Sequence, residues 1–371
     1  RNKRGYGRWH TGMLAPGGKL ERIIRPLTSF RSYRSFRIFF DTALNGQGCQ
    51  RRGWLGVAGR LDYFYAPKHT PRRKLGEAPQ PRQPPRRDEK WGAQLFPSMP
   101  GGLDSPFEAC FLTLAMLRMG LSVAEASVLF EIGTGTVSAI YNTWVVFVAR
   151  SLEAWTPFPT RQQVRAGIPK VFREKLAKTT HSASCRIIID CTEIEVEIPE
   201  DDALKKLYYS KYKHRHTMKF LVGITPSGSI SFVSYGYPGS IEDDDIVRES
   251  GLIDLIEQGD AVMADRGFTD WPGLRESGKE LIIPALSLAR GQGEGVARAP
   301  FSEEENERTY RIAHVRIHVE RMMRAIKAGW RVFDRPIPMH RIPAVSRYIF
   351  SIAARMTTWE APLQGVEYLD R

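Results

Sequence analysis

Residues 185–199 have the sequence CRIIIDCTEIEVEIP, which is rich in Ile and Val and ends at a proline. This composition predicts a β-strand whose side chains alternate between two faces. On the face formed by the even positions Asp190 is the only charged residue, whereas the odd positions end in Glu193, Glu195 and Glu197, as expected for a face in contact with water. Because an unpaired buried carboxylate is strongly unfavourable, Asp190 needs a partner. That partner is either a metal ion or a structural group, such as an arginine or backbone N–H groups.

Two further acidic residues lie in patterns typical of a ligand site. The segment GDAVMADRGF predicts a short apolar strand, Ala261–Ala264, that is followed at once by Asp265. This carboxylate is expected at the carboxyl end of a core strand, where ligands bind in α/β sheets, next to Gly267, which would let the chain turn sharply. Further on, apolar spacing predicts an amphipathic helix with Glu320 at the edge of its buried stripe. The apolar positions of that helix are 312, 315, 319, 322 and 326.

The order and setting of these acidic residues resemble those of the PIF/Harbinger-like DDE superfamily endonucleases, a family of transposase nucleases. The segment between the first two acids is also similar to the family, with a Y-S-x-Y-K segment, a hairpin and a G-S-x-x-D turn that ends at Asp243. The resemblance runs from about Arg186 to Trp330. It implies an α/β fold of the RNase H-like type, in which a mixed sheet is flanked by helices. It also implies a catalytic and metal-binding set formed by Asp190, Asp265 and Glu320.

The chemistry that the resemblance implies is phosphodiester cleavage and strand transfer. Mg²⁺ prefers carboxylate oxygens, water and phosphate as ligands, and two Mg²⁺ or Mn²⁺ ions about 4 Å apart can activate a water and stabilise the leaving oxygen. The chain is therefore expected to be an enzyme, a DNA endonuclease or transposase that cleaves DNA and joins 3′-OH ends to target DNA. Two alternatives stay open. One is a domesticated, transposase-derived DNA-binding or adaptor protein without catalytic activity, and the other is a metal-dependent nuclease acting on RNA or structured DNA.

Basic residues near the three acids are candidates for contacts with DNA phosphates. The segment Tyr208–His216 interleaves aromatic and basic residues, which suits a surface for nucleic-acid strands, although a solvated loop would have the same composition. Arg266 and Arg321 directly follow two of the predicted metal ligands, so each would serve equally well as a structural counter-ion. The candidates in this region are Lys211, Lys213, Arg266, Arg316 and Arg321.

Three helical patterns precede the predicted sheet. They cover Pro106–Arg118, Val123–Phe130 and a third helix from Thr134 or Gly135 to Leu152. Ser122 and Glu125 form a capping-box pattern at the second helix, and two short helices joined by a glycine-containing turn are typical of helix-turn-helix proteins. The segment is also similar to the region that precedes the nuclease domain in the transposase family. A plain helical bundle is the alternative, because the third helix has no Lys or Arg before Arg150. The predicted DNA contacts of the third helix are Thr134, Thr136 and Ser138.

The positive charge of the chain is concentrated in its first hundred residues. The formal net charge is +13, and residues 1–100 contain 21 Lys and Arg against 6 Asp and Glu, whereas the remaining 271 residues contain 33 and 35. Such a leader suits sequence-independent contact with phosphates, although a solvated tail would look the same. The Pro-, Arg- and Gln-rich segment 66–100 predicts disorder, while residues 35–44 predict a short helix or strand.

These patterns predict three domains and an intracellular DNA-associated protein. The domains are a disordered basic leader over residues 1–100, a helix-turn-helix-like domain over 101–160 and an endonuclease domain over 161–371. Four cysteines without a C-x-x-C pair predict reduced thiols and no zinc finger. No apolar run approaches the roughly 18 residues of a membrane helix. The resemblance and a basic cluster at residues 71–74 favour the nucleus. The expected partners are transposon ends and target duplex DNA, further copies of the chain in a homo-oligomer, and a second DNA-binding protein.

The predicted elements of the endonuclease domain complete this expectation. Further strands are predicted at residues 218–224, 229–234 and 280–283, with a turn at 225–228. Helices are predicted at residues 243–257 and 342–356.

Overall fold

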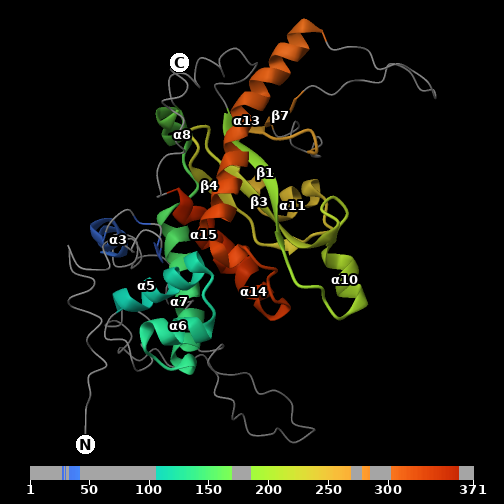
Figure 1. Ribbon diagram of the computed structural model, residues 1–371. Helices are drawn as coiled ribbons and strands as arrows, with labels where there is room; N and C mark the ends of the chain where they lie inside the picture. The colour runs from blue at the N-terminus through green and yellow to red at the C-terminus, as the bar shows by residue number, and fades with distance from the viewer. Residues whose placement is uncertain are drawn as a thin grey trace, which may run out of the picture. The chain divides into compact units, whose positions relative to one another are not determined.

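The computed structural model describes residues 27–28, 30, 33–41, 106–168, 185–268, 278–284 and 302–358. Most of the predicted leader, including segment 66–100, lies outside these residues. Contacts divide the chain into two compact units, one consisting mainly of residues up to Trp155 and one running from Thr156 onward, with residues 29–31 and 117–120 assigned to the second unit. In the first unit the described elements are helices, whereas the second contains a sheet with helices on both faces (Figure 1).

The first unit has helices at all three positions that the sequence predicts. They are α5 (Pro106–Met119), α6 (Val123–Phe130) and α7 (Thr134–Trp155), and they are preceded by α3 (Tyr33–Phe39). Both hydrogen bonds of the predicted capping box form between Ser122 and Glu125. Phe36 of α3 packs against Phe107, with ring centroids 4.6 Å apart. The helix-turn-helix assignment itself stays a prediction.

The second unit is built on a mixed sheet, as expected, but the sheet has seven strands, and two short ones, Tyr209–Ser210 and Tyr237–Pro238, were not predicted. Its strands are β1 (Cys185–Glu195), β2 (Tyr209–Ser210), β3 (Arg215–Ile224), β4 (Ile230–Val233), β5 (Tyr237–Pro238), β6 (Ala261–Met263) and β7 (Glu280–Ile282). The main path has the order β2-β3-β1-β6-β7, and β4 and β5 also pair with β3. β1 pairs antiparallel with β3 and parallel with β6, and β6 pairs parallel with β7. The central strand of this sheet is therefore the one that carries Asp190.

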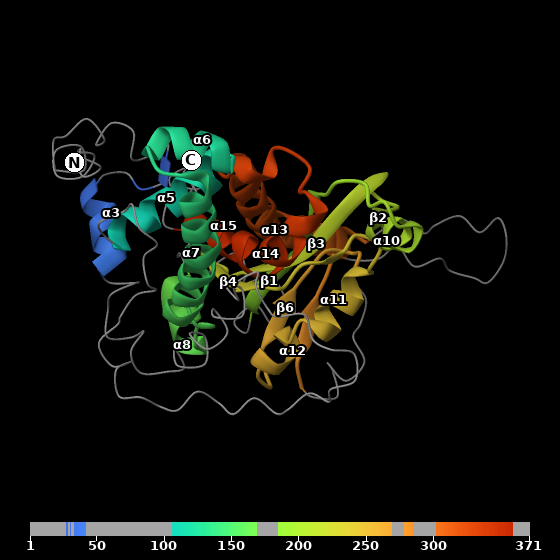
Figure 2. The same ribbon diagram turned by 90° about the horizontal axis from the view of Figure 1, so that it is seen from below.

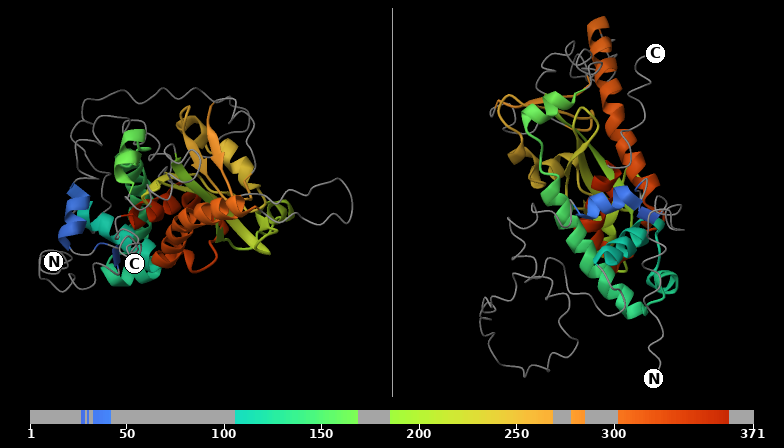
Figure 3. Two further views of the ribbon diagram at one scale, coloured as in Figure 1. Left: turned by 90° about the horizontal axis from the view of Figure 1, so that it is seen from above. Right: turned by 90° about the vertical axis from the view of Figure 1, so that its left-hand side faces the viewer.

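Helices cover both faces of the sheet (Figure 2). On one face α11 (Asp243–Glu249) and α12 (Leu252–Leu255) pack against an apolar cluster that includes Ile187 and Ile189 of β1. On the other face lie α13 (Glu303–Gly329) and α15 (Phe350–Thr357), and Phe350 stacks on Phe220 of β3 with ring centroids 4.0 Å apart. Phe220 is paired with Thr192, so the even positions of β1, including Asp190, face α13 and α15. Figure 3 shows α13 crossing this face, where it contacts β1 and β3.

Two predicted helices are interrupted, and two helices were not predicted. The single helix expected at residues 243–257 is divided into α11 and α12 at Gly251, which has a φ of 78° that a regular helix cannot contain. The helix expected at residues 342–356 consists of α14 (Ile342–Ala344), a π-helical segment Val345–Ile349 and α15. The unpredicted helices are α8 (Arg161–Gly167), with Val164 as its one buried residue, and α10 (Asp202–Tyr208), with none, so neither has an apolar period to reveal it.

The remaining described elements are short. α8 (Arg161–Gly167) precedes the sheet, and two 3₁₀ turns, Arg331–Phe333 and Met339–Arg341, follow α13. Cys110, Cys185 and Cys191 are free thiols, as predicted, while Cys49 lies outside the described residues. No single helix in the described part of the chain is long and apolar enough to cross a membrane, and only the pair α6 and α7, bent by 107°, passes that test by length and composition.

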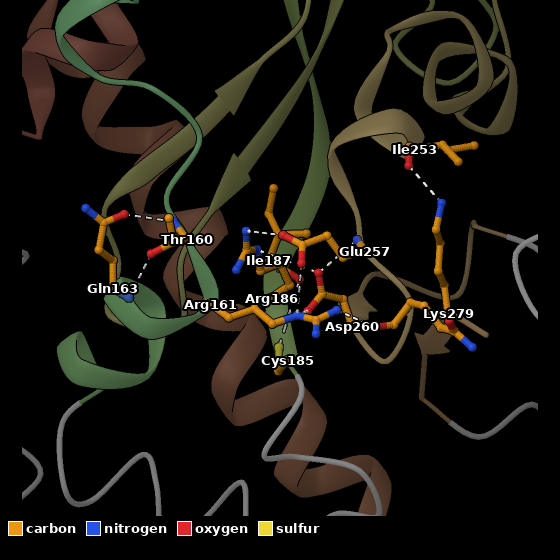
Figure 4. A network of polar contacts seen from close by, with 11 residues as sticks. Thr160, Arg161, Gln163, Cys185, Arg186, Ile187, Ile253, Glu257, Asp260 and Lys279 are labelled. Atoms are coloured by element: carbon orange, nitrogen blue, oxygen red, sulfur yellow. Dashed lines mark hydrogen bonds and ion pairs between the residues drawn. The ribbon is translucent and has the colours of Figure 1, made fainter. Parts of the chain in front are cut away.

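A buried ion-pair network fixes α8 to the amino ends of the central strands (Figure 4). Arg161 of α8 lies with its Nε 2.7 Å from Oδ1 of Asp260, which precedes β6. Arg186 of β1 lies with its Nε 3.8 Å from Oδ2 of the same carboxylate and its Nη2 3.5 Å from Glu257. The side chains of Arg186 and Asp260 are only 3% and 2% exposed. This network lies at the amino ends of β1 and β6, away from Asp190 in the middle of β1 and Asp265 beyond the carboxyl end of β6.

Candidate active site

Strand register brings Asp190 and Asp265 to the same level of the sheet. Ile188 of β1 is paired with Met263 of β6, and the two strands are parallel. Asp190 and Asp265 each lie two residues beyond this pair, so they are level with each other, Asp190 in the middle of β1 and Asp265 just beyond the carboxyl end of β6, as predicted for Asp265. The turn after Asp265 does not depend on Gly267, contrary to expectation. Gly267 is not among the described residues with positive φ, and a Cβ atom there would meet nothing within 4 Å.

Helix α13 carries the third acid across this edge. A full capping box between Ser302 and Glu305 starts the helix, and its buried stripe contains all the predicted apolar positions. Those buried positions are Ile312, Val315, Val319, Met322 and Ile326. Arg316 is also buried in this stripe, with only 8% of its side chain exposed, whereas Glu320, one turn further on, is 52% exposed. The helix therefore presents one cation and one carboxylate to the edge of the sheet.

The guanidinium of Arg316 is the point at which the three predicted acids meet. Its Nη2 lies 3.4 Å from Oδ2 of Asp190 and 3.5 Å from Oε1 of Glu320. Its Nη1 lies 3.1 Å from Oδ1 of Asp265. These acids come from the central strand, from the turn after its parallel neighbour and from the covering helix, and they are brought together around one side chain.

These contacts set upper limits on the separation of the acids. The oxygens of Asp190 and Glu320 share one nitrogen neighbour, so they are at most about 7 Å apart. The two terminal nitrogens of a guanidinium are joined through a single carbon by bonds of ~1.33 Å. The oxygens of Asp190 and Asp265 are consequently at most about 9 Å apart. Small movements of side chains are enough to bring the three carboxylates to a common ligand.

Asp190 is the most buried of the three acids. Its side chain is 18% exposed, and its Oδ1 accepts a 2.8 Å hydrogen bond from the backbone N–H of Cys191. Burial raises the pKa of Asp190 from 3.8 to about 6. The charge of Arg316 and the N–H of Cys191 act in the opposite direction, whereas the negative charges of Asp265 and Glu320 add to the increase. The sequence left a metal and an arginine open as partners of Asp190, and in this structure the partner is an arginine.

The ligand chemistry and the charge of this cluster fit divalent metal ions. Three carboxylates offer the oxygen ligands that Mg²⁺ and Mn²⁺ prefer. One guanidinium offsets only one of their negative charges, so the cluster attracts further cations when the acids are ionised. As the side chains stand, no three His, Cys, Asp or Glu residues of the described ranges form a group able to hold a metal. The three acids therefore have the chemistry of metal ligands but not yet the arrangement, and the Arg316 guanidinium lies between them.

The other predicted DNA contacts are placed at three separate locations. Arg266 follows Asp265 in its turn and donates its backbone N–H to that carboxylate at 2.7 Å, and Arg321 is exposed on α13 beside Glu320. Lys211 and Lys213 are exposed in the turn between β2 and β3. At the start of α7, Thr134 is exposed and Thr136 and Ser138 are half-buried. The structure thus brings Arg266, Arg316 and Arg321 next to the acids but places the lysines elsewhere on the same unit.

Two features of the second unit were not expected from the sequence. One is a cavity of about 540 Å³ whose basic lining residues are Lys213, Arg215 and Lys327. Burial and the charge of Lys213 lower the pKa of Lys327, while the nearby negative charges of Glu193 and Asp190 raise it, which links this cavity electrostatically to the site. Lys327 follows Glu320 by two helical turns, and this seven-residue spacing was the only sequence signal that could have indicated it.

The second feature is an ion pair on the face of the sheet opposite to Asp190, where α11 packs. Lys219 of β3 donates from its Nζ to Oδ1 of Asp243 at 2.9 Å. Asp243, which ends the G-S-x-x-D turn noted in the sequence, begins α11. Side chains of a strand alternate between the two faces of a sheet, so the position of Lys219 within β3 could have indicated a partly buried lysine. Such a lysine needs a carboxylate as its partner.

Comparison with known proteins agrees with the resemblance seen in the sequence. Residues 189–357 match the family model described as DDE superfamily endonuclease, and this range contains all three acids. Over 184 residues the chain is 23% identical to Protein ALP1-like of Arabidopsis thaliana. That match covers 48% of this chain and 43% of the relative, so the chain matches less than half of the relative's length. No solved structure matches the chain significantly. The family model covers the strand, turn and helix that carry Asp190, Asp265 and Glu320, and residues 189–357 are therefore similar to the DDE superfamily endonucleases.

Proposed function

We propose that this protein is a metal-dependent DNA endonuclease of the transposase type, with Asp190, Asp265 and Glu320 as its catalytic carboxylates. The observation that carries the proposal is their convergence on the guanidinium of Arg316 from three elements far apart in sequence. The endonuclease family match over residues 189–357 supports the same reaction class. The mixed sheet with helices on both faces is compatible with an RNase H-like fold, which the proposal includes.

The surroundings of each acid suit a different role in binding metal and substrate. Asp190 is held on the central strand by the Cys191 N–H, which bonds its Oδ1 and leaves Oδ2 as an oxygen that would hold metal. Asp265 and Glu320 are about half exposed, which suits ligands that must meet both an ion and the substrate. Two Mg²⁺ or Mn²⁺ ions, when bound, would activate a water and stabilise the leaving 3′ oxygen. The same set of residues would align the freed 3′-OH for joining to target DNA, because phosphoryl transfer depends on positioning and charge neutralisation.

The DNA is proposed to follow the basic groups around this centre. Arg266 and Arg321 flank the acids, and the cavity with Lys213, Arg215 and Lys327 lies further along α13. The proposal also includes a leader over residues 1–100 that contacts phosphates, a helix-turn-helix-like domain over 101–160 that contacts DNA through Thr134, Thr136 and Ser138, and the endonuclease domain over 161–371. A homo-oligomer in the nucleus, acting on transposon ends and target duplex with a second DNA-binding protein, is the expected assembly.

The test is metal-dependent cleavage of DNA by the full chain. Supercoiled plasmid should be nicked in the presence of Mg²⁺ or Mn²⁺ and left intact in EDTA. Asp190→Asn, Asp265→Asn and Glu320→Gln should each lower the rate by about a hundredfold or more, since each removes a charge that stabilises the transition state. Matched controls are Asp254→Asn on the surface of α12 and Glu304→Gln at the exposed start of α13, which should nick at the wild-type rate. Wild-type nicking no faster than that of Asp190→Asn under both metals would reject the enzymatic proposal.

A second measurement separates a transposase from other nucleases. A labelled duplex with a free 3′-OH should be joined to plasmid DNA by the wild type and not by the three acid variants. Cleavage of RNA or of structured DNA without any joining would instead favour the nuclease that acts without transposition. With either outcome Asp190, Asp265 and Glu320 remain the proposed catalytic residues, and only the proposed substrate differs.

A second candidate function is favoured by the position of Arg316. Because its guanidinium lies between the acids, the cluster as it stands is a closed ion-pair centre rather than an open metal site. Such a centre suits a transposase-derived DNA-binding or adaptor protein without catalytic activity. Salt-dependent binding of duplex DNA that is unaffected by EDTA, together with the absence of nicking, would support this candidate over the enzyme.

A further inference from the structure

Arg316 is an unusual residue for the buried face of a helix. Its neighbours in the stripe, Val315 and Val319, are apolar and 1% and 0% exposed, and the Arg316 side chain is itself only 8% exposed. Burying a cation is costly unless negative charge and hydrogen bonds compensate for the lost water. Here the compensation comes from three separate carboxylates, all of them residues of the proposed catalytic set. The position of Arg316 is therefore tied to that set and not to the packing of the helix.

The contacts of Arg316 are long for charge-assisted hydrogen bonds. They measure 3.1, 3.4 and 3.5 Å, whereas such bonds are usually about 2.7–2.9 Å and arginine pairs best with one carboxylate in a two-bond arrangement. Arg161 and Arg215 in the same unit reach their carboxylates at 2.7 and 2.8 Å. In addition, the buried Nε of Arg316 has no hydrogen-bond partner among the described residues. Arg316 thus supplies charge to all three acids without a strong bond to any one of them.

The acids need this charge whenever no other cation is present. Asp190 and Glu320 approach the same guanidinium nitrogen, and Asp265 approaches the other one. Without a cation between them, these carboxylates would repel one another and separate. A divalent ion placed at the same point would neutralise more charge than the guanidinium does, and it would use the same oxygens. The two cations therefore compete for one position.

We propose that the guanidinium of Arg316 is a built-in cation that holds the three carboxylates together in the metal-free protein and gives way when divalent metal binds. This inference rests on the proposed function, because it assumes that the acids are metal ligands. Arg316 is then a positioning residue, since it keeps the three carboxylates together. It also weakens their affinity for metal, because the metal must displace the guanidinium. The released guanidinium keeps its charge next to the site, where a substrate phosphate would lie.

The test measures metal affinity and stability instead of activity. Titration calorimetry of the full chain with Ca²⁺ and with Mn²⁺ should show tighter binding by Arg316→Gln than by the wild type, by roughly tenfold, a coupling of ordinary size for two ligands of one site. In EDTA the same variant should melt at a lower temperature than the wild type, and saturating Ca²⁺ should restore most of the loss. The matched control is Arg324→Gln, which removes an exposed arginine two turns further along α13 and should change neither quantity.

The results separate this inference from the proposed function. Equal or weaker metal binding by Arg316→Gln, with wild-type binding that requires Asp190 and Asp265, would overturn the inference and leave the metal site in place. Absence of binding that depends on these acids, in the wild type and in Arg316→Gln alike, would overturn the metal site as well.

A structural measurement covers the case in which Arg316→Gln does not fold. Crystals of the wild type grown in EDTA should have the guanidinium among the three acids, and crystals grown with Ca²⁺ should have it outside. A guanidinium that stays between the acids beside bound Ca²⁺ would contradict the inference without any variant.

Discussion

Lys219 of β3 and Asp243 of α11 form an ion pair in which Nζ lies 2.9 Å from Oδ1, and the same Nζ also donates to the backbone oxygen of Ile241 at 2.8 Å. The Lys219 side chain is only 12% exposed. Burial works to lower the pKa of Lys219, but the hydrogen bond and charge of Asp243 outweigh it and raise the pKa. This pair fastens the G-S-x-x-D turn to the sheet, close to Cys191, the neighbour of Asp190.

Loss of this pair should destabilise the second unit. Lys219→Met leaves Asp243 without its partner and should lower the free energy of unfolding by about 1–3 kcal/mol, as measured by urea denaturation. Asp243→Asn should cost less, because an amide oxygen can still accept the hydrogen bond. The double variant should cost less than the sum of the two single variants. Additive losses would mean that the two side chains do not depend on each other.

Asp190 should lower stability at neutral pH when no metal is bound. Its pKa is about 6 in the folded protein against 3.8 for the unfolded group, so the folded state binds more protons between these values. Stability therefore increases as pH falls from about 7 to 4, and the unfavourable contribution is fully present only above about pH 7. Asp190→Asn should raise the free energy of unfolding by about 1–3 kcal/mol at pH 7.5 in EDTA and by much less near pH 4.

The control for this measurement is Asp254→Asn, which changes an exposed carboxylate on α12. It should have little effect at either pH. A gain in stability of the same size at both pH values in Asp190→Asn would show that ionisation of Asp190 is not the cause.

Gly239 should not tolerate a side chain, whereas Gly267 should. A Cβ atom at Gly239 would lie 2.2 Å from Oγ1 of Thr217 and 2.7 Å from the backbone oxygen of Tyr208. Gly239→Ala should therefore lower the free energy of unfolding by about 1–3 kcal/mol. Gly267→Ala meets nothing within 4 Å and has no positive φ, so its effect should stay within about 0.5 kcal/mol. Thermal unfolding of the two variants side by side decides the point, and equal melting temperatures would contradict it.

Asp260 should be the most sensitive residue of the network at the opposite end of the sheet. Asp260→Ala leaves Arg186, which is 3% exposed, without its buried carboxylate and should cost about 3–5 kcal/mol. Glu257→Ala removes the other carboxylate near Arg186, but Glu257 is 60% exposed, so the loss should be under about 1 kcal/mol. Urea denaturation measures both, and similar losses in the two variants would show that burial does not decide the strength of these pairs.

Local sequence patterns predicted the helices and strands well wherever one buried face produces a regular repeat of apolar residues. The strand at 185–195 and the buried stripe of α13 were found in this way, and the capping signal at Ser122 identified the start of α6. α10 was missed because none of its residues is buried. The break at Gly251 was missed because the apolar spacing of α11 continues into α12, and only the left-handed backbone of that glycine ends the helix.

The convergence of the acids was predicted only through the family resemblance. Periodicity placed Asp190 on the inner face of a strand but did not identify its partner, since Arg316 is 126 residues away in the chain. The sequence suggested a phosphate contact for Arg316, and its position between three carboxylates depends on the parallel register of β1 and β6 and on the path of α13. Such a position is a property of the tertiary structure, so no single segment of the sequence contains it.

Arg316 and Glu320 lie one turn apart on the same rigid helix. A shift of α13 would carry both of them together, so the main chain cannot withdraw the one and keep the other in place. Exchange of the guanidinium for a metal ion must then occur through rotation about the bonds of one long side chain. The backbone that carries the ligands would then have the same conformation with and without metal, because only the buried Arg316 side chain has to leave its place.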